Sequence, residues 1–168
     1  MTQSVELLMD PVSEARVVAE WRLLDEAGLR SQAQHRGESN RPHVTLAAVD
    51  ELPAPLDPIL SDVCRRRLPL AATLGALVVF GGRRVTLARL VVPGAALLDL
   101  HAAVSSHLDD AGSLTEVGRW VPHVTLALRM PPAELPSAVD VLGAGPGDVR
   151  FETARRWDGV GRRTWALV

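Results

Sequence analysis

Cysteine, lysine, tyrosine and long apolar runs are scarce or missing in this chain of 168 residues. The single cysteine, Cys64, excludes a disulfide within the chain and leaves no cysteine cluster for a metal ion. No apolar stretch approaches the roughly 20 residues that a membrane-spanning helix needs. Residues 1–10 also lack the basic start and apolar stretch of a signal peptide. We therefore expect a cytoplasmic protein that has no membrane partner and binds no metal.

An excess of positive charge is missing too. The 18 basic residues, all of them arginine, face 20 acidic ones, which gives a formal net charge of −2 and a pI near 6.2. A protein that binds a long nucleic-acid duplex normally carries a basic surface, so we expect no such partner. A small anionic ligand or the end of a strand remains open. Codon bias in a GC-rich genome is the simplest explanation for the use of arginine alone, although its planar fork also fits phosphate well.

Strand-like and helical segments alternate along the chain, and no low-complexity linker divides them. The length and the 47% share of apolar residues suit a single domain over residues 1–168. The expected strands are 4–9, 43–49, 72–80, 83–92, 120–130, 149–157 and 163–168, and the expected helices are 11–28, 57–68, 95–109 and 134–142. This order predicts an α+β fold with two similar halves.

The tetrapeptide HVTL occurs once in each half, at residues 43–46 and 123–126, and both copies directly follow a proline. Successive side chains of a strand point to opposite faces. The histidine and threonine of each copy therefore share one face, while the valine and leucine anchor the other. If a pseudo-two-fold axis relates the halves, both His-Thr pairs can line one groove.

Two facing imidazoles suit an in-line displacement at phosphorus. Near neutral pH one ring can be neutral and accept a proton from the attacking group, while the other is protonated and donates to the leaving oxygen. The threonine hydroxyls can donate hydrogen bonds to the non-bridging phosphate oxygens, where negative charge gathers. The candidate catalytic residues are therefore His43, Thr45, His123 and Thr125. A single His-x-Thr on a strand is common and carries little meaning, but two identical copies in matching halves favour catalysis.

On these two motifs the sequence resembles the 2H phosphoesterase superfamily, which includes 2′-5′ RNA ligase-like proteins and cyclic nucleotide phosphodiesterases. The resemblance extends over nearly the whole chain and includes the Phe80-Gly81-Gly82 hairpin between the motifs. It implies a bilobal fold of two pseudo-symmetric halves, with antiparallel sheets around a central groove and two catalytic histidines. It also implies hydrolysis of phosphodiesters, with reversible ligation in some members, and the two-histidine chemistry requires no metal or other cofactor. The substrates it implies are 2′,3′-cyclic phosphates, ADP-ribose cyclic phosphate and 2′-5′ linked RNA.

Two departures from the ligase-like pattern concern the substrate. Such members often carry an arginine five positions after the second histidine, where this chain has Leu128 followed by Arg129. On a regular strand, Arg129 would share the histidine face but lie about 20 Å from His123, so it could reach the phosphate only if the strand bulges. The first motif continues into Ala47-Ala48-Val49 instead of aromatic residues. Base stacking must then fall to a tryptophan or to Phe80, or be weak.

Arg41 and Arg129 are the candidate substrate-binding residues, Arg41 because it precedes His43 by two positions on the same face. An exposed arginine at a loop end is the alternative for Arg41. Trp120, His101 and Cys64 are expected to pack in the interior, Cys64 as a small core residue and not as a nucleophile. His35 and His107 are expected to be exposed.

The sequence therefore predicts a metal-independent, monomeric 2H phosphodiesterase. Its expected partner is a small nucleotide or an RNA end carrying a 2′,3′-cyclic phosphate or a 2′-5′ linkage. Two alternatives stay open: a non-catalytic protein that binds nucleotides or RNA ends, and an RNA 2′-5′ ligase. The sequence does not separate hydrolysis from ligation, because the two reactions share one transition-state geometry.

Overall fold

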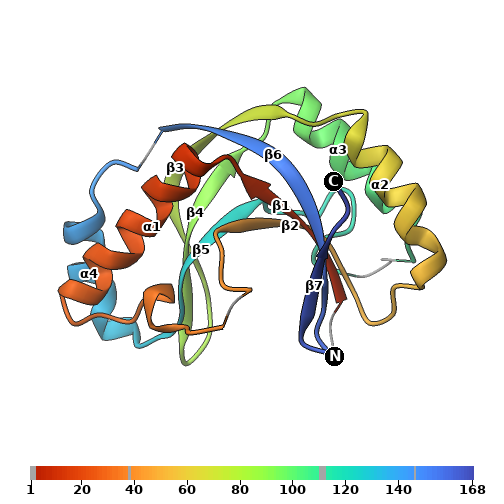
Figure 1. The fold of residues 1–168 in the computed structure, drawn as a ribbon. Helices are drawn as coiled ribbons and strands as arrows, with labels where there is room; N and C mark the ends of the chain where they lie inside the picture. Colours follow the sequence, from red (N-terminus) through yellow and green to blue (C-terminus); the bar gives the residue numbers. More distant parts are fainter. Residues whose placement is uncertain (1–2, 38, 110–112, 146) are drawn as a thin grey trace.

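The computed structural model describes residues 3–37, 39–109, 113–145 and 147–168, which form one curved antiparallel sheet covered by helices (Figure 1). The strands are β1 (Gln3–Met9), β2 (His43–Val49), β3 (Leu70–Phe80), β4 (Val85–Val92), β5 (His123–Met130), β6 (Gly147–Asp158) and β7 (Arg163–Ala166). The helices are α1 (Pro11–Glu26), α2 (Asp57–Arg65), α3 (Ala95–Ser105) and α4 (Leu135–Leu142), and short 3₁₀ turns lie at Gln32–Gln34, Ala54–Leu56 and Pro132–Glu134. The α+β class predicted from the sequence is confirmed.

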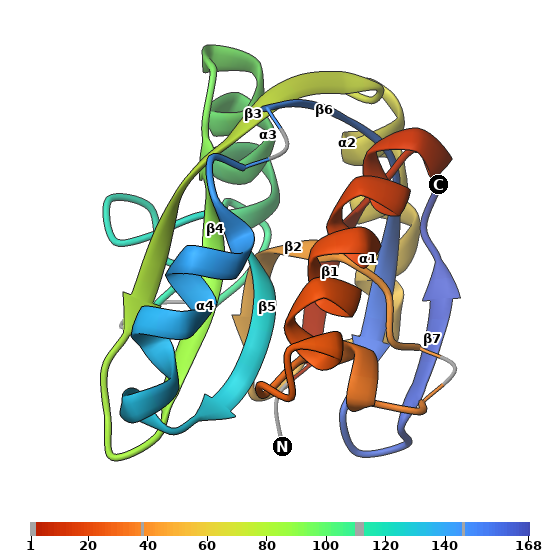
Figure 2. The same cartoon turned by 90° about the vertical axis from the view of Figure 1, so that its left-hand side faces the viewer.

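The strand order in the sheet is β2-β1-β6-β3-β4-β5, with β7 paired to β6. Two halves, β2-β1-β6-β7 and β3-β4-β5, are thus joined where β3 pairs with β6. Although β2 and β5 stand at opposite ends of this order, they contact each other. The sheet must therefore curl until its two edge strands meet, and Figure 2 shows the two halves facing each other around this curl.

The helices divide between the halves. Helices α1 and α4 pack together, and α1 reaches β5, whereas α2 and α3 pack together, and α3 reaches β2. In Figure 1 the two pairs lie on opposite sides of the central strands. Helix α1 begins where the sequence predicts, because Pro11 follows Asp10, whose carboxylate accepts a hydrogen bond of 2.7 Å from the Ser13 amide. Hydrogen bonds with the side chain and then the backbone amide of Ser13 lower the pKa of Asp10.

A buried ion pair ties α1 to the far half of the sheet. Arg89 on β4 is only 2% exposed, and its guanidinium donates to Glu20 of α1 through Nε at 3.0 Å. The same guanidinium donates at 3.2 Å to the carbonyls of Leu142 and Gly143, at the end of α4. Arg89 therefore connects three elements, and its charge is compensated by Glu20.

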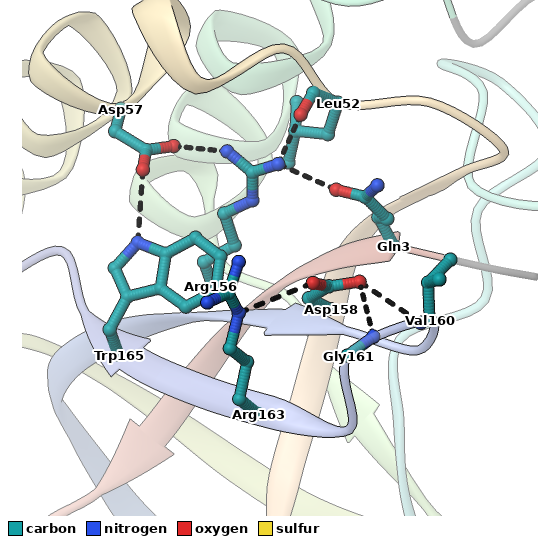
Figure 3. Close-up of polar contacts among 9 residues, drawn as sticks. All are labelled: Gln3, Leu52, Asp57, Arg156, Asp158, Val160, Gly161, Arg163 and Trp165. Carbon is teal, nitrogen blue, oxygen red and sulfur yellow. Dashed lines mark hydrogen bonds and ion pairs between the residues drawn. The ribbon is translucent and has the colours of Figure 1, made fainter.

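A second polar network fixes the C-terminal hairpin (Figure 3). Arg156 of β6 donates to the Asp57 carboxylate, the Leu52 carbonyl and the Gln3 side chain. Asp57 also accepts from the indole of Trp165 on β7, at 2.9 Å. In the turn between β6 and β7, the Asp158 carboxylate accepts from the backbone amides of Val160 and Gly161, at 3.0 and 3.1 Å. These contacts hold β7 and the start of α2 against β6.

Candidate active site

Each HVTL copy lies on one of the two edge strands that meet. His43 and Thr45 of β2 are partly exposed, whereas the intervening Val44 and the following Leu46 are fully buried. β5 repeats the pattern: its histidine and threonine are partly exposed, and its valine and leucine are fully buried. The alternation predicted from the sequence is therefore present in both copies.

Both imidazoles are oriented in the same way. Nδ1 of His43 lies 2.7 Å from the Arg41 carbonyl, and Nδ1 of His123 lies 2.7 Å from the Val121 carbonyl. A carbonyl oxygen can only accept, so Nδ1 must carry the proton in each ring. This leaves Nε2 of both rings to accept or donate the proton that a reaction requires.

The surroundings of the two histidines differ. Burial lowers the pKa of the His123 ring, the bond to the Val121 carbonyl raises it, and the nearby His43 ring lowers it. Phe80 packs against the His123 ring at 4.5 Å between ring centroids. His43 instead faces a buried carboxylate, with its Nε2 3.8 Å from Glu6 Oε1. One ring is thus held toward its neutral form, while the other has a negative charge beside it.

Two tryptophans hold the motif strands at their threonines. The indole of Trp120, just before β5, donates to the Thr45 carbonyl of β2 at 2.9 Å. The indole of Trp21, on α1, donates to the Thr125 carbonyl of β5 at 3.0 Å. Trp120 is also stacked on the buried ring of His101, with 4.0 Å between centroids. The expected interior packing of Trp120 and His101 is confirmed, and the added hydrogen bonds fix the backbone from which the threonine hydroxyls project.

A bulge follows each motif at the same place. Glu6 and Val5 of β1 pair with Thr45 and Ala47, so Leu46 is the extra residue of β2. On β5 the equivalent pairs leave Leu126 as the extra residue. The inserted residue shifts the alternation of side chains between the two faces of the strand by one position. Beyond the bulge, Leu128 and not Arg129 therefore lies on the same face as His123.

The carbonyl of Arg41 bonds to His43, but the side chain of Arg41 pairs elsewhere. Arg41 forms an ion pair with Glu14 of α1, with 3.1 Å between its Nε and Oε1. Arg129 is exposed and takes up a left-handed backbone conformation, with φ of 58°, at a second irregularity of β5. The bulge that the sequence argument required is present, but its effect is to turn Leu128 toward His43. A role of Arg41 or Arg129 in substrate binding stays a prediction.

Sequence reasoning missed a pocket of about 230 Å³ beside His43. After Gln3, Ser4 and Glu6 are the polar residues of the first strand and alternate with apolar ones, a signal that could have indicated Glu6 as a groove residue. Arg155 could not be found in this way, because its place depends on the pairing of β6 with β1. The pocket is lined by Glu6, Gln32, His35, Ser39, Asn40, His43, Leu128, Arg155 and Trp157.

The thiol of Cys64 is unsuited to nucleophilic attack. It is fully buried, and burial raises its pKa to about 11. The prediction that Cys64 is a core residue is confirmed. Among the residues that the structure describes, no group of three or more histidine, cysteine or acidic side chains could hold a metal ion. In the same part of the chain, no helix is long and apolar enough to cross a membrane.

A family model decides the classification. The model of the 2′-5′ RNA ligase superfamily matches residues 9–158. The chain belongs to the 2′-5′ RNA ligase superfamily. The 2H phosphoesterase resemblance seen in the two HVTL copies is thereby confirmed. No curated protein matches the chain.

Solved structures of 2H proteins share the fold. Escherichia coli LigT complexed with 3′-AMP aligns with a TM-score of 0.62 and 17% identity, over 99% of this chain and 96% of LigT. TT0787 of Thermus thermophilus gives 0.59 and 18%, over 100% of this chain and 96% of TT0787. Usb1 of Kluyveromyces marxianus gives 0.57 and 13%, over 99% and 97%. At these identities the similarity establishes the fold that this superfamily member shares with them.

Proposed function

We propose that the protein is a metal-independent phosphodiesterase that hydrolyses 2′,3′-cyclic phosphates on nucleotides or RNA ends. Matched His-Thr pairs on two contacting edge strands are the observation that carries this proposal. Each pair presents one Nε2 and one hydroxyl, which together supply a proton acceptor, a proton donor and two hydrogen-bond donors. Membership of the 2′-5′ RNA ligase superfamily supports the same chemistry.

His123 acts as the general base. Its lowered pKa keeps the ring neutral near neutral pH, so Nε2 can take a proton from the attacking water. The water oxygen forms a bond to phosphorus as the bond from phosphorus to one ribose oxygen breaks. The product is a nucleoside monophosphate.

His43 acts as the general acid. The bond from its Nδ1 to the Arg41 carbonyl fixes the ring and leaves Nε2, which lies 3.8 Å from Glu6 Oε1, to carry the proton. That ring gives its proton to the departing ribose oxygen, which balances the proton taken up by His123. The different surroundings of the two histidines thus assign them different roles.

Thr45→Val and Thr125→Val should each lower kcat on a 2′,3′-cyclic nucleotide by roughly tenfold to a hundredfold. Valine keeps the shape and removes the hydroxyl that donates to the phosphate oxygens. Thr73→Val is the matched control, because its hydroxyl donates to Asp148 at 3.0 Å, on β6, and not to a motif residue. Steady-state kinetics on the three variants would test this, and equal kcat in all three would exclude the hydroxyls from the reaction.

Hydrolysis should continue in excess chelator, because the described residues offer no metal cluster and the chemistry needs none. The measurement is a panel of 2′,3′-cyclic nucleotides and 2′-5′ linked dinucleotides, incubated with EDTA, with the products resolved by chromatography. Loss of activity in EDTA and its return with a divalent ion would contradict the mechanism.

The same panel separates the alternatives. Ligation is the reverse displacement, with a ribose hydroxyl in place of water, so a 2′-5′ linked product formed from a cyclic phosphate and a free 5′-hydroxyl end would favour the ligase. Nucleotide binding without turnover of any substrate would favour the binding protein.

A further inference from the structure

The pocket beside His43 contains a buried arginine, and only one of its three guanidinium nitrogens donates a hydrogen bond within the described residues. Arg155 of β6 is 7% exposed, and its Nε donates to Glu6 Oε2 at 2.7 Å. Within residues 3–37, 39–109, 113–145 and 147–168, its two terminal amino groups donate to no side chain or carbonyl. Among these residues, the buried side-chain atoms without a hydrogen-bond partner are Glu20 Oε2 and Arg156 Nε. The amino groups of Arg155 are not among them, so they are reached by solvent. The amino groups of Arg155 therefore open into the pocket that the residue lines.

Glu6 holds this guanidinium from one side. Its Oε2 takes the Nε of Arg155, and its Oε1 accepts from the Ser4 hydroxyl at 2.8 Å. The carboxylate is thus saturated by its own strand and by β6, and its charge is balanced. Since the pairing occupies only Nε, the two amino groups keep the fork that fits two oxygens of a phosphate.

The position of the pocket distinguishes its ligand from the phosphate that is cleaved. The lining includes His43 but neither His123 nor the two motif threonines, so a group in the pocket lies beside the reacting phosphate. Leu128 and Trp157 add apolar surface, and His35 lies at the rim. An anionic group joined to the nucleoside next to the cleaved bond suits this arrangement.

We propose that Arg155 binds a second phosphate of the substrate, on the 5′ oxygen of the nucleoside whose cyclic phosphate is cleaved. This inference rests on the proposed function, because it places the reacting phosphate between the two histidines. It makes an RNA end or a 5′-phosphorylated nucleotide a better substrate than a simple cyclic mononucleotide.

Binding of two product-like probes tests the inference without any turnover. Adenosine 3′,5′-bisphosphate and 3′-AMP differ only in the second phosphate, and calorimetry gives the affinity of each. The wild type should bind the bisphosphate about tenfold to a hundredfold more tightly. Arg155→Gln should remove this difference and leave the affinity for 3′-AMP unchanged. Arg150→Gln is the control: it removes a positive charge from the same strand but outside the pocket, and it should keep the preference for the bisphosphate.

Equal affinities for the two probes in the wild type would overturn the inference, and so would a preference that survives Arg155→Gln. A loss of both affinities in Arg155→Gln would also overturn it, because Arg155 would then serve the reacting phosphate or the fold. If Arg155→Gln does not fold, the double variant Glu6→Gln/Arg155→Met removes both buried charges and replaces it. Because these are binding measurements, absent turnover would refute the proposed function alone.

Discussion

His43→Ala and His123→Ala should each lower kcat/KM on a 2′,3′-cyclic nucleotide by roughly 10²–10⁴-fold, the usual contribution of a general acid or base. Each change removes the Nε2 through which that motif exchanges a proton with the substrate. Affinity for a product nucleotide should fall far less than turnover, since the hydroxyls that hold the phosphate oxygens stay in place. Steady-state kinetics and a binding titration on the same variants would measure both effects.

The fold should survive both changes. The described contacts of each imidazole are with its own chain two residues earlier and with neighbouring rings or Glu6 at the groove, while the apolar side of each motif is untouched. His107→Ala is the matched control, because this histidine is exposed and lines a different pocket. Full activity in both motif variants would mean that the two HVTL copies are structural, and would exclude the enzymatic mechanism.

Arg89→Met should destabilise the protein by about 3–5 kcal/mol, the cost of leaving one member of a buried ion pair without its partner. Glu20 is 7% exposed and would keep a charge with no compensating cation, and the Leu142 and Gly143 carbonyls would lose a donor. Urea unfolding followed by circular dichroism would give the change in the free energy of unfolding.

The double variant Glu20→Leu/Arg89→Met separates charge from packing. Replacing both members by apolar residues of similar size removes the unpaired charge, so it should recover most of the stability that Arg89→Met loses. Arg66→Met is the surface control: its ion pair with Asp62 is exposed and should contribute less than about 1 kcal/mol. An Arg89→Met protein as stable as the Arg66→Met protein would contradict the role given to Arg89.

The elements and the motif faces could be predicted from the sequence because both depend on local patterns. Val44 and Leu46 alternate with His43 and Thr45 whatever the rest of the chain does, and Asp10-Pro11 starts a helix by its own chemistry. The placement of Leu128 could not be predicted, because a bulge at Leu126 shifts the alternation, and a bulge is set by the partner strand.

The remaining features of the site depend on pairings between distant segments. Arg155 lies beside Glu6 only because β6 crosses back to pair with β1, and the Thr125 carbonyl meets Trp21 only because the sheet curls. The ion pair of Arg41 with Glu14 could not be predicted for the same reason, because the two residues are far apart in the sequence. This ion pair engages the guanidinium that the sequence alone suggested as a phosphate ligand. Local patterns thus identify the candidate chemical groups, and the topology determines which of them stand together.

The pairing of β1 with β6 also determines the order in which the groove can form during synthesis. Gln3 pairs with Asp158, so β1 waits for β6, which is synthesised more than 130 residues later. A nascent chain that has emerged to Met130 carries both histidine motifs and β2, yet β1 lacks β6 on its other side and Glu6 lacks Arg155. Contacts so far apart in sequence form slowly, because a long loop must close before they gain anything. The pocket beside His43 is therefore completed only after β6 has been synthesised. A chain that ends before β6 carries both motifs but lacks Arg155 and Trp157, which line that pocket.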